Sequence, residues 1–353
     1  MQNAKPETAV RASGIKTMAP PRRLRDRSLL RMLRALPRKR PLSLALQGGG
    51  SFGAFTWGVL DRLLEQDGLV LDMVSGTSAG AVNAVVLANG LAEGGPAEAR
   101  DRLDRFWRRV SKAAVFSGAA GAAATSALEF STRVFSPYQF NPLDLNPLRA
   151  ILAQEIDFER LRRKSPVRLL IAATRLRDGR PRLFREHEIT LEAVIASASL
   201  PLLHHAVAID GEWYWDGGYS ANPPLRQLAV ESTAADIMVV QITPEEENGV
   251  PRSSSQIARL VARFSFTGPL RRDMEALDDL CALCREGRIF RSRLCRKLNR
   301  LRLHHSVAER SVAELRRASA FNVDWSFLSR LKQAGRAASE DWLSAERRPR
   351  SSA

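Results

Sequence analysis

A serine held between two glycines is the residue in this sequence whose setting best suits covalent chemistry. It lies in a G-T-S-A-G pentapeptide at positions 76–80, directly after an apolar run, 69–74, that predicts a strand. A strand that turns sharply into a helix at G-x-S-x-G holds the serine in a strained position, and the glycines leave room for the turn. Ser78 is therefore a candidate nucleophile. Because a serine hydroxyl is a poor nucleophile until a base takes its proton, it needs a partner.

A glycine-rich turn precedes this serine in the chain. It spans residues 48–53, after an alternating apolar strand pattern at 42–46, and it falls where a helix should begin. Backbone amides at the start of a helix have no intrahelical partner and can hold a negative charge. The turn therefore predicts an oxyanion hole, to which the amide after the nucleophile also contributes. The candidate donors are Gly48, Gly49, Gly50 and Ala79.

The same turn also matches G-x-G-x-x-G, the pattern of a dinucleotide-binding loop. In that alternative, Asp72 would be the acid that binds a ribose. Three features disfavour it: the next strand ends in G-x-S-x-G, Asp72 falls inside that strand, and the second half of the chain shows no repeated strand–helix–strand pattern.

Three motifs in register resemble those of the patatin-like phospholipases. They are the glycine turn at 48–53, the serine pentapeptide at 76–80 and the tripeptide Asp216-Gly217-Gly218. The segments Ser197–Pro201 and Ala221–Pro223 are also similar to that family, and the resemblance covers roughly residues 41–243. The sequence departs from the family at Phe52, where a basic side chain is usual, although backbone oxyanion donors do not depend on that side chain.

The resemblance implies a Ser-Asp dyad in place of a triad, without metal or cofactor. Ser78 would be the nucleophile and Asp216 the base that hydrogen-bonds to its hydroxyl. A carboxylate with a reference pKa of about 3.9 is a weak base, but a desolvated one is stronger. The implied activity is that of a lipid acyl hydrolase, of phospholipase A or lysophospholipase type, acting on phospholipids or other acyl esters through an acyl-serine. The motif glycines are Gly53, Gly76, Gly80, Gly217 and Gly218.

Two other groups of residues could form a site. In a conventional triad a histidine would follow the acid, and only His304 and His305 do so, in an arginine-rich stretch without turn residues. Surface or helix-packing roles are preferred for both. The C-x-x-C pair Cys281 and Cys284, with Cys295 and His304, suggests zinc, but these two cysteines fall on the leucine-bearing face of a predicted helix. We therefore predict no metal.

The formal charge of +16 and the pI near 10.9 indicate an anionic partner. Arginines concentrate at 22–40 and 271–302, among leucines spaced as in an amphipathic helix. This pattern suits peripheral contact with an anionic membrane surface. Aromatic residues for base stacking are not interleaved there, so no nucleic acid is expected. The alternative to the enzyme is a basic membrane- or nucleic-acid-binding protein with a degenerate hydrolase site, and the oligomeric state is not predicted.

The sequence predicts a three-layer α/β fold, with a mixed, mainly parallel central sheet between helices and a helical C-terminal part. The predicted boundaries are a basic, flexible N-terminal tail at 1–40, the acyl hydrolase domain at 41–343 and a disordered tail at 344–353. No run of about 18 apolar residues predicts a membrane span, no apolar stretch predicts a signal peptide, and three cysteines favour a reducing compartment. The predicted location is the cytoplasm, with peripheral contact on the inner face of the membrane as an alternative.

Overall fold

One mixed sheet forms the centre of the protein. The computed structural model describes residues 41–116, 136–243, 250–286, 292–308 and 319–347. The strands are β1 (Pro41–Leu46), β2 (Val70–Thr77), β3 (Arg168–Arg175), β4 (Pro181–Arg185), β5 (Val207–Ile209), β6 (Glu212–Asp216), β7 (Asp236–Gln241) and β8 (Arg302–Val307). Their order is β5-β6-β3-β2-β1-β7-β8, and β4 also pairs with β3. The pairs from β3 through β2, β1 and β7 to β8 are parallel, whereas β4 and β6 pair antiparallel with β3, as does β5 with β6.

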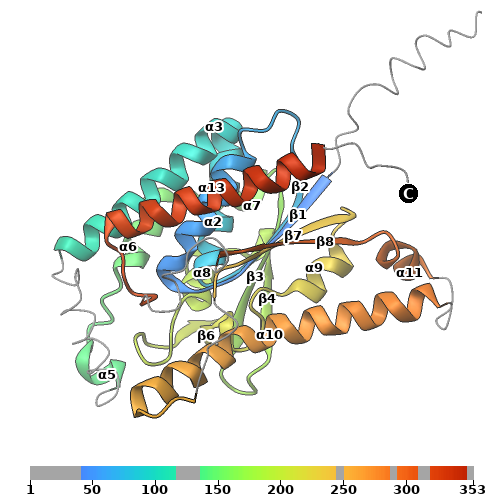
Figure 1. The fold of residues 1–353 in the computed structure, drawn as a ribbon. Coiled ribbons are helices and arrows are strands. Elements are labelled where there is room, and N and C mark those ends of the chain that lie inside the picture. The colour runs from blue at the N-terminus through green and yellow to red at the C-terminus, as the bar shows by residue number, and fades with distance from the viewer. Residues whose placement is uncertain (1–40, 117–135, 244–249, 287–291, 309–318, 348–353) are drawn as a thin grey trace, which may run out of the picture. The chain divides into compact units, whose positions relative to one another are not determined.

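Helices cover both faces of this sheet (Figure 1). They are α2 (Gly53–Leu63), α3 (Ala79–Phe116), α5 (Pro137–Phe140), α6 (Pro147–Glu155), α7 (Phe158–Lys164), α8 (Leu191–Ser197), α9 (Leu225–Glu231), α10 (Ser254–Arg285), α11 (Arg293–Leu298) and α13 (Trp325–Arg347), with 3-10 turns η1 (Gly50–Phe52), η2 (Glu186–Glu188) and η3 (Gly217–Tyr219). Helices α2, α3 and α13 lie on one face, and α9 and α10 on the other. The predicted three-layer arrangement is confirmed. None of the described helices combines the length and the apolar character that a membrane span requires.

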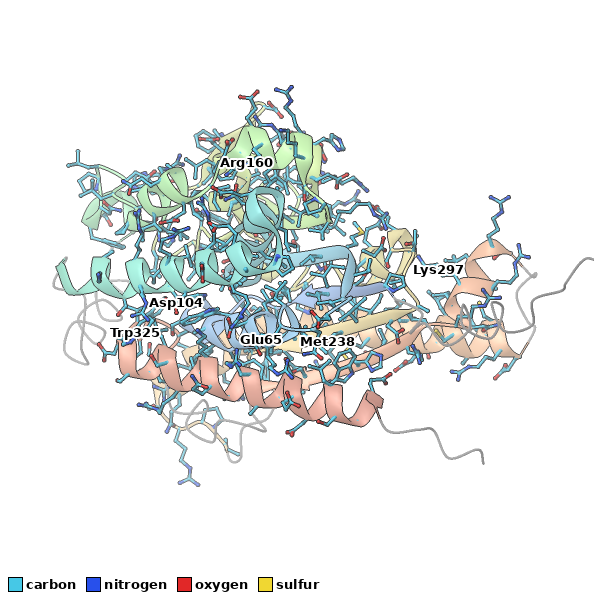
Figure 2. The ribbon with its side chains drawn as sticks, turned by 90° about the horizontal axis from the view of Figure 1, so that it is seen from above. Glu65, Asp104, Arg160, Met238, Lys297 and Trp325 are labelled. Atoms are coloured by element: carbon cyan, nitrogen blue, oxygen red, sulfur yellow. The ribbon has the colours of Figure 1, made fainter. Side chains whose placement is uncertain are left out.

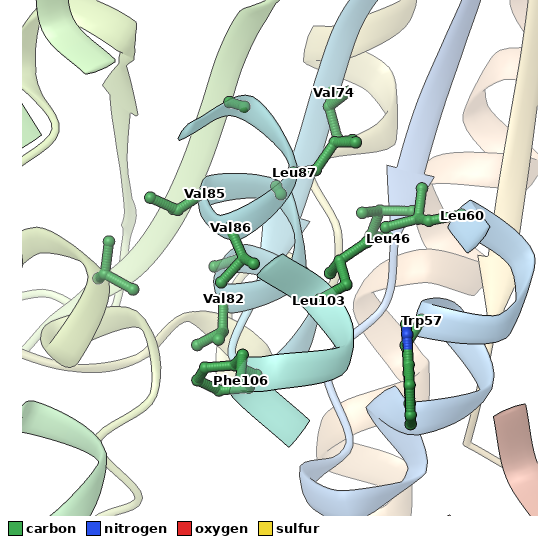
Figure 3. Close-up of a cluster of buried hydrophobic side chains, with 14 of the residues drawn as sticks. Leu46, Trp57, Leu60, Val74, Val82, Val85, Val86, Leu87, Leu103 and Phe106 are labelled. Atoms are coloured by element: carbon green, nitrogen blue, oxygen red, sulfur yellow. The ribbon is translucent and has the colours of Figure 1, made fainter. Parts of the chain in front are cut away.

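Two apolar cores fill the space between these layers. Alternate residues of β7 divide between them: Met238 and Val240 belong to the first core, and Ile237 and Val239 to the second. This division follows from the two-residue period of a strand, whose side chains point to opposite faces. Figure 3 shows the first core, where side chains of α2 and α3 pack against those of β1 and β2. A sheet that is buried on both faces explains why the parallel strands read as continuous apolar runs.

The C-terminal region differs in part from the prediction. It is mainly helical, as predicted, but Arg302–Val307 forms an unpredicted strand, β8, which pairs parallel with β7. Among the described strands, β8 ends the sheet, so the polar residues in it reach solvent, and no alternating apolar pattern marks it in the sequence. Helix α13 continues to Arg347, past the predicted domain boundary at 343. The predicted N-terminal tail, 1–40, and residues 348–353 lie outside the described residues.

Helix α13 packs closely along α2 because each helix carries a glycine at the crossing. A Cβ at Gly58 would overlap the carbonyl oxygen of Lys332, and a Cβ at Gly335 would overlap that of Phe55. The backbones therefore approach to a distance that no larger residue permits. This contact ties the C-terminal helix to the glycine turn, which leads directly into α2.

Ion pairs bind the exposed side of the same helices. Arg336 pairs with the buried Asp61 and lies 3.0 Å from Glu65, and Lys332 Nζ lies 3.3 Å from Asp104. Figure 2 shows Glu65, Asp104 and Trp325 along the seam between α13 and its neighbours. The C-terminal helix is thus an integral part of the domain.

Replacing Gly58 by alanine is expected to lower the free energy of unfolding by about 1–3 kcal/mol, because the added methyl group meets backbone that has no room to move. Urea unfolding measures the change. The matched control is Gly268→Ala in α10, where an added Cβ has no atom within 4 Å. That change should alter the free energy of unfolding by less than about 1 kcal/mol, because the helix preference of alanine over glycine is opposed by the restriction that Pro269 places on the residue before it. Equal effects of the two changes would contradict the close packing of α13 on α2.

Candidate active site

Ser78 lies at the sharp turn between β2 and α3. Its φ of 52° is in the left-handed region, which costs free energy for any residue except glycine. The turn is possible only because its flanking residues lack side chains: a Cβ at Gly76 would overlap the carbonyl of Gly80, and a Cβ at Gly80 would overlap that of Leu46. The structure thus has the strained strand-to-helix turn that the pentapeptide predicts.

Asp216 ends β6 and is completely buried. Its Oδ1 accepts a hydrogen bond from the Gly218 amide at 2.7 Å, and its own amide donates to the Ser199 carbonyl at 2.8 Å. The Thr174 hydroxyl donates to the Asp216 carbonyl at 2.7 Å. Oδ2, by contrast, has no hydrogen-bond partner among the described residues. One carboxylate oxygen is therefore fixed, and the other is available to accept a proton.

The sheet register places Ser78 and Asp216 next to each other. Strand β4 pairs along one edge of β3, so β2 and β6 must both pair along the other edge, one after the other. Thr77, the last residue of β2, lies opposite Ala172, and Asp216, the last residue of β6, lies opposite Ala173. The two strands therefore end at the same point. The structure brings together two residues that the sequence motifs place far apart in the chain.

Burial makes the Asp216 carboxyl group an unusually weak acid. Desolvation raises its pKa from 3.8 to about 7, against the opposing effects of the Gly218 amide and the Ser78 hydroxyl. The serine hydroxyl is thus near enough to influence the carboxylate, although no hydrogen bond to Oδ2 is formed in this structure. Such catalytic contacts are often loose before substrate binds. The neighbouring Tyr219 has its pKa raised to about 12, by burial and then by the Asp216 charge. An aspartate of this kind is a much better base than an exposed one.

The glycine turn lies against the serine, but one of its predicted donors is already used. A Cβ at Gly48 would come within 2.7 Å of the Ser78 Cβ, so the turn and the nucleophile are in contact. The Gly48 amide donates to the Asn222 side-chain oxygen at 2.7 Å, which corrects the prediction that this amide serves an oxyanion. The remaining candidates, whose amides donate to no described residue, are Gly49, Gly50 and Ala79.

Phe52, the departure from the family pattern, is explained by the C-terminal helix. Its buried ring meets Phe327 of α13 edge-on, with ring centroids 6.3 Å apart. Close by, the Ser51 amide donates to the Ala320 carbonyl at 2.8 Å, and Gly50 takes a φ of 58°. The glycine turn is thus anchored by apolar packing and a backbone hydrogen bond to the C-terminal part of the chain.

Three residues that hold the site were not assigned a role from the sequence. The Ser197 hydroxyl accepts from the Ser78 amide at 3.0 Å, and the Ser199 carbonyl accepts from the Asp216 amide. Asn222 holds the Gly48 amide, as described above. These residues lie in the Ser197–Pro201 and Ala221–Pro223 segments, so the resemblance marked the segments but not their function.

The alternative triad is not supported by the position of His304. Its Nε2 lies 2.9 Å from Asp236 Oδ1, and its ring meets Trp342 of α13 edge-on. Asp236 begins β7, whereas Ser78 follows the end of β2, and β1 joins these two strands in parallel. Asp236 and Ser78 therefore lie at opposite ends of the parallel strands. His305 is exposed on β8.

Asp72, the residue of the alternative dinucleotide site, and the cysteines of the alternative zinc site contribute to the folded structure. Asp72 is held by Arg168 Nη2 at 2.8 Å and by the Thr233 amide at 2.6 Å. Burial raises its pKa, but these hydrogen bonds outweigh burial and lower the pKa to about 2. Cys284 and Cys295 are buried in the second core. Among the residues described, no group of three or more His, Cys, Asp or Glu side chains is placed to hold a metal ion.

Comparison with known proteins shows the class to which this fold and site correspond. A family model described as patatin-like phospholipase matches residues 44–229, more than half of the chain, and the protein therefore belongs to that family. Among solved structures, VipD from Legionella pneumophila is similar, with 16% sequence identity and a TM-score of 0.43, over 88% of this chain and 67% of that one. The comparison with curated proteins found no match.

Proposed function

We propose that this protein is a lipid acyl hydrolase of phospholipase A or lysophospholipase type, with Ser78 and Asp216 as its catalytic dyad. Membership of the family supports action on lipids in general. One observation supports the assignment of the dyad. Ser78, on a strained turn, and Asp216, whose buried carboxylate has one oxygen without a hydrogen bond among the described residues, lie at the ends of two strands that pair along the same edge of β3.

In the proposed mechanism, Asp216 Oδ2 takes the hydroxyl proton while Ser78 Oγ attacks the ester carbonyl. The oxyanion of the tetrahedral intermediate accepts hydrogen bonds from the amides of Gly49, Gly50 and Ala79. When the intermediate collapses, the bond to the alcohol breaks and Asp216 returns the proton to the leaving oxygen. Water then attacks the acyl-serine, with Asp216 again as base, and releases the fatty acid and the free serine.

A fluorophosphonate probe tests the proposal, because it forms a stable bond only with an activated serine. We expect one adduct, located by mass spectrometry on the peptide that contains Ser78. Labelling should be much slower in Asp216→Asn, where no base takes the proton. An adduct on another serine, or ester turnover without any labelling, would be evidence against this dyad.

The proposal includes the predicted partners and location. The substrate would be a phospholipid or another acyl-ester lipid, and the enzyme would contact an anionic membrane surface peripherally, from the cytoplasmic side. The formal charge of +16 supports this, because a basic surface is attracted to anionic lipid headgroups.

A further inference from the structure

The N-terminal half of α10 carries large apolar side chains that face solvent. Ile257, Val261 and Phe264 are 48%, 58% and 55% exposed. Their spacing is i, i+4 and i+7, which places them on one face of the helix. Val250, just before the helix, is 82% exposed. Apolar side chains gathered on one exposed face indicate a surface that contacts something apolar.

The charge of this segment identifies the kind of partner. Residues 250–272 contain no acidic residue, and three glutamates precede them at 245–247. The arginines of the segment are Arg252, Arg259, Arg263, Arg271 and Arg272. A helix with an apolar face and arginines as its charged residues suits the boundary between headgroups and acyl chains of an anionic membrane.

This half of α10 is joined directly to the candidate active site. The ring of Phe266 meets Tyr219 edge-on, with centroids 5.1 Å apart, and leaves no space for a Cβ at Gly218. The Phe266 carbonyl accepts from Asn222 Nδ2 at 2.9 Å, and Asn222 in turn holds the Gly48 amide. The helix therefore contacts the loop that follows Asp216 and, through Asn222, is linked to the glycine turn.

A second group of exposed apolar side chains comes from residues 138–145 and from the segment after Ser199, on which Tyr138 packs. Its members are Tyr138, Leu143, Leu145 and Leu202, which are 53–78% exposed. The Tyr138 ring stacks on His205 with centroids 4.1 Å apart, and its hydroxyl accepts from the Ala206 amide at 3.2 Å. Leu202, His205 and Ala206 follow Ser199, whose carbonyl accepts from the Asp216 amide. Exposed apolar residues thus flank the Asp216 loop in two separate parts of the chain.

We propose that the face of α10 formed by Ile257, Val261 and Phe264 docks on an anionic phospholipid bilayer and holds the active site against it. Figure 1 shows this end of the helix near β6, the strand that ends in Asp216. That docking promotes phospholipid hydrolysis rests on the proposed function, whereas binding to the bilayer does not. Binding can therefore be tested without any assay of hydrolysis.

The experiment compares the full chain with the triple variant Ile257→Ser, Val261→Ser, Phe264→Ser. Binding is measured by co-sedimentation with vesicles of phosphatidylcholine alone and with vesicles that also contain phosphatidylglycerol. We expect the wild type to prefer the anionic vesicles, and the triple variant to bind them at least about tenfold more weakly, because it removes the apolar side chains that would enter the bilayer. The matched control is Val70→Ser, Val230→Ser, which changes residues 38% and 45% exposed in β2 and α9, outside both basic segments. It should bind as the wild type does.

Turnover of a soluble short-chain ester separates the two proposals. It should be the same in the wild type and in the triple variant, whereas hydrolysis of phospholipid in vesicles should fall in proportion to binding. If the triple variant loses vesicle binding and neither the wild type nor the variant hydrolyses any ester, the docking face is supported and the proposed hydrolase is refuted. Equal vesicle binding by the wild type and the triple variant, or equal binding to both kinds of vesicle, would overturn the docking proposal. A thermal melt checks that the variant is folded, and Phe264→Ser alone should give a smaller loss in the same direction.

Discussion

Replacing Ser78 by alanine is expected to lower the turnover of a soluble ester by at least about 10⁴-fold, because removing the nucleophile of a serine hydrolase leaves only the oxyanion hole and substrate binding. A p-nitrophenyl ester assay under saturating substrate measures the loss. The fold should persist, since the Ser78 side chain is not needed for packing. Turnover within tenfold of the wild type would show that another residue attacks the ester.

The chain offers a close control for this change. Ser75 lies on β2, just before the turn, and its buried hydroxyl has no hydrogen-bond partner among the described residues. Ser75→Ala removes the same atom and should leave turnover unchanged. Ser78→Gly should be as inactive as Ser78→Ala but more stable by about 1 kcal/mol, because glycine adopts a φ of 52° without strain.

Local features of the site were predictable from the sequence because short motifs dictate their own geometry. The pentapeptide 76–80 allows only one kind of turn, and the Asp210-Gly211 pair, a typical hairpin-turn sequence, takes φ values of 51° and 80° between β5 and β6. The second strand of that hairpin pairs with β3 and so places Asp216 beside Ala173. The strand order follows less directly, but the alternation of strands and helices already favoured a parallel sheet.

Contacts between distant residues could not be predicted in the same way. The Asn222 side chain accepts a hydrogen bond from the Gly48 amide, 174 positions away in the chain. No local sequence pattern distinguishes an amide that makes such a hydrogen bond from one that does not. The packing of Phe52 on Phe327 likewise depends on where α13 lies. Strand β8 was missed because it ends the described sheet, where polar residues are tolerated and the usual alternation is lost.

The ionisation of Asp216 should make kcat/KM depend strongly on pH. Only the ionised carboxylate can take the serine proton, so kcat/KM of the wild type should rise with pH and level off above a pKa of about 7. Asp216→Asn should lower turnover by about 10²–10⁴-fold at pH 8, as expected for the loss of a general base, and the difference should narrow below pH 7, where the wild-type carboxylate is itself protonated. A wild-type profile that is flat from pH 5 to 8 would contradict a base with this pKa.

The same pKa predicts that Asp216→Asn is more stable than the wild type at high pH. A carboxylate with a pKa of 3.8 when unfolded and about 7 when folded binds more protons in the folded state between these values. The free energy of unfolding of the wild type therefore falls as pH rises through this range and is constant above it, and the asparagine variant avoids that loss. The stability difference should grow from near zero at pH 4 to at most about 4 kcal/mol at pH 8, measured by urea unfolding.

Asp236→Asn is the opposite case and serves as the control. Burial raises the pKa of Asp236, but the hydrogen bonds from His304 and Arg302 outweigh it, and the net pKa is lowered. The ionised form of this aspartate stabilises the folded protein above its unfolded pKa, and that stability is lost as pH falls. Asp236→Asn should therefore destabilise the protein at neutral pH and leave ester turnover unchanged. If both variants were destabilised at pH 8, Asp216 would not be a desolvated base, and the physical reason for a dyad without histidine would be lost.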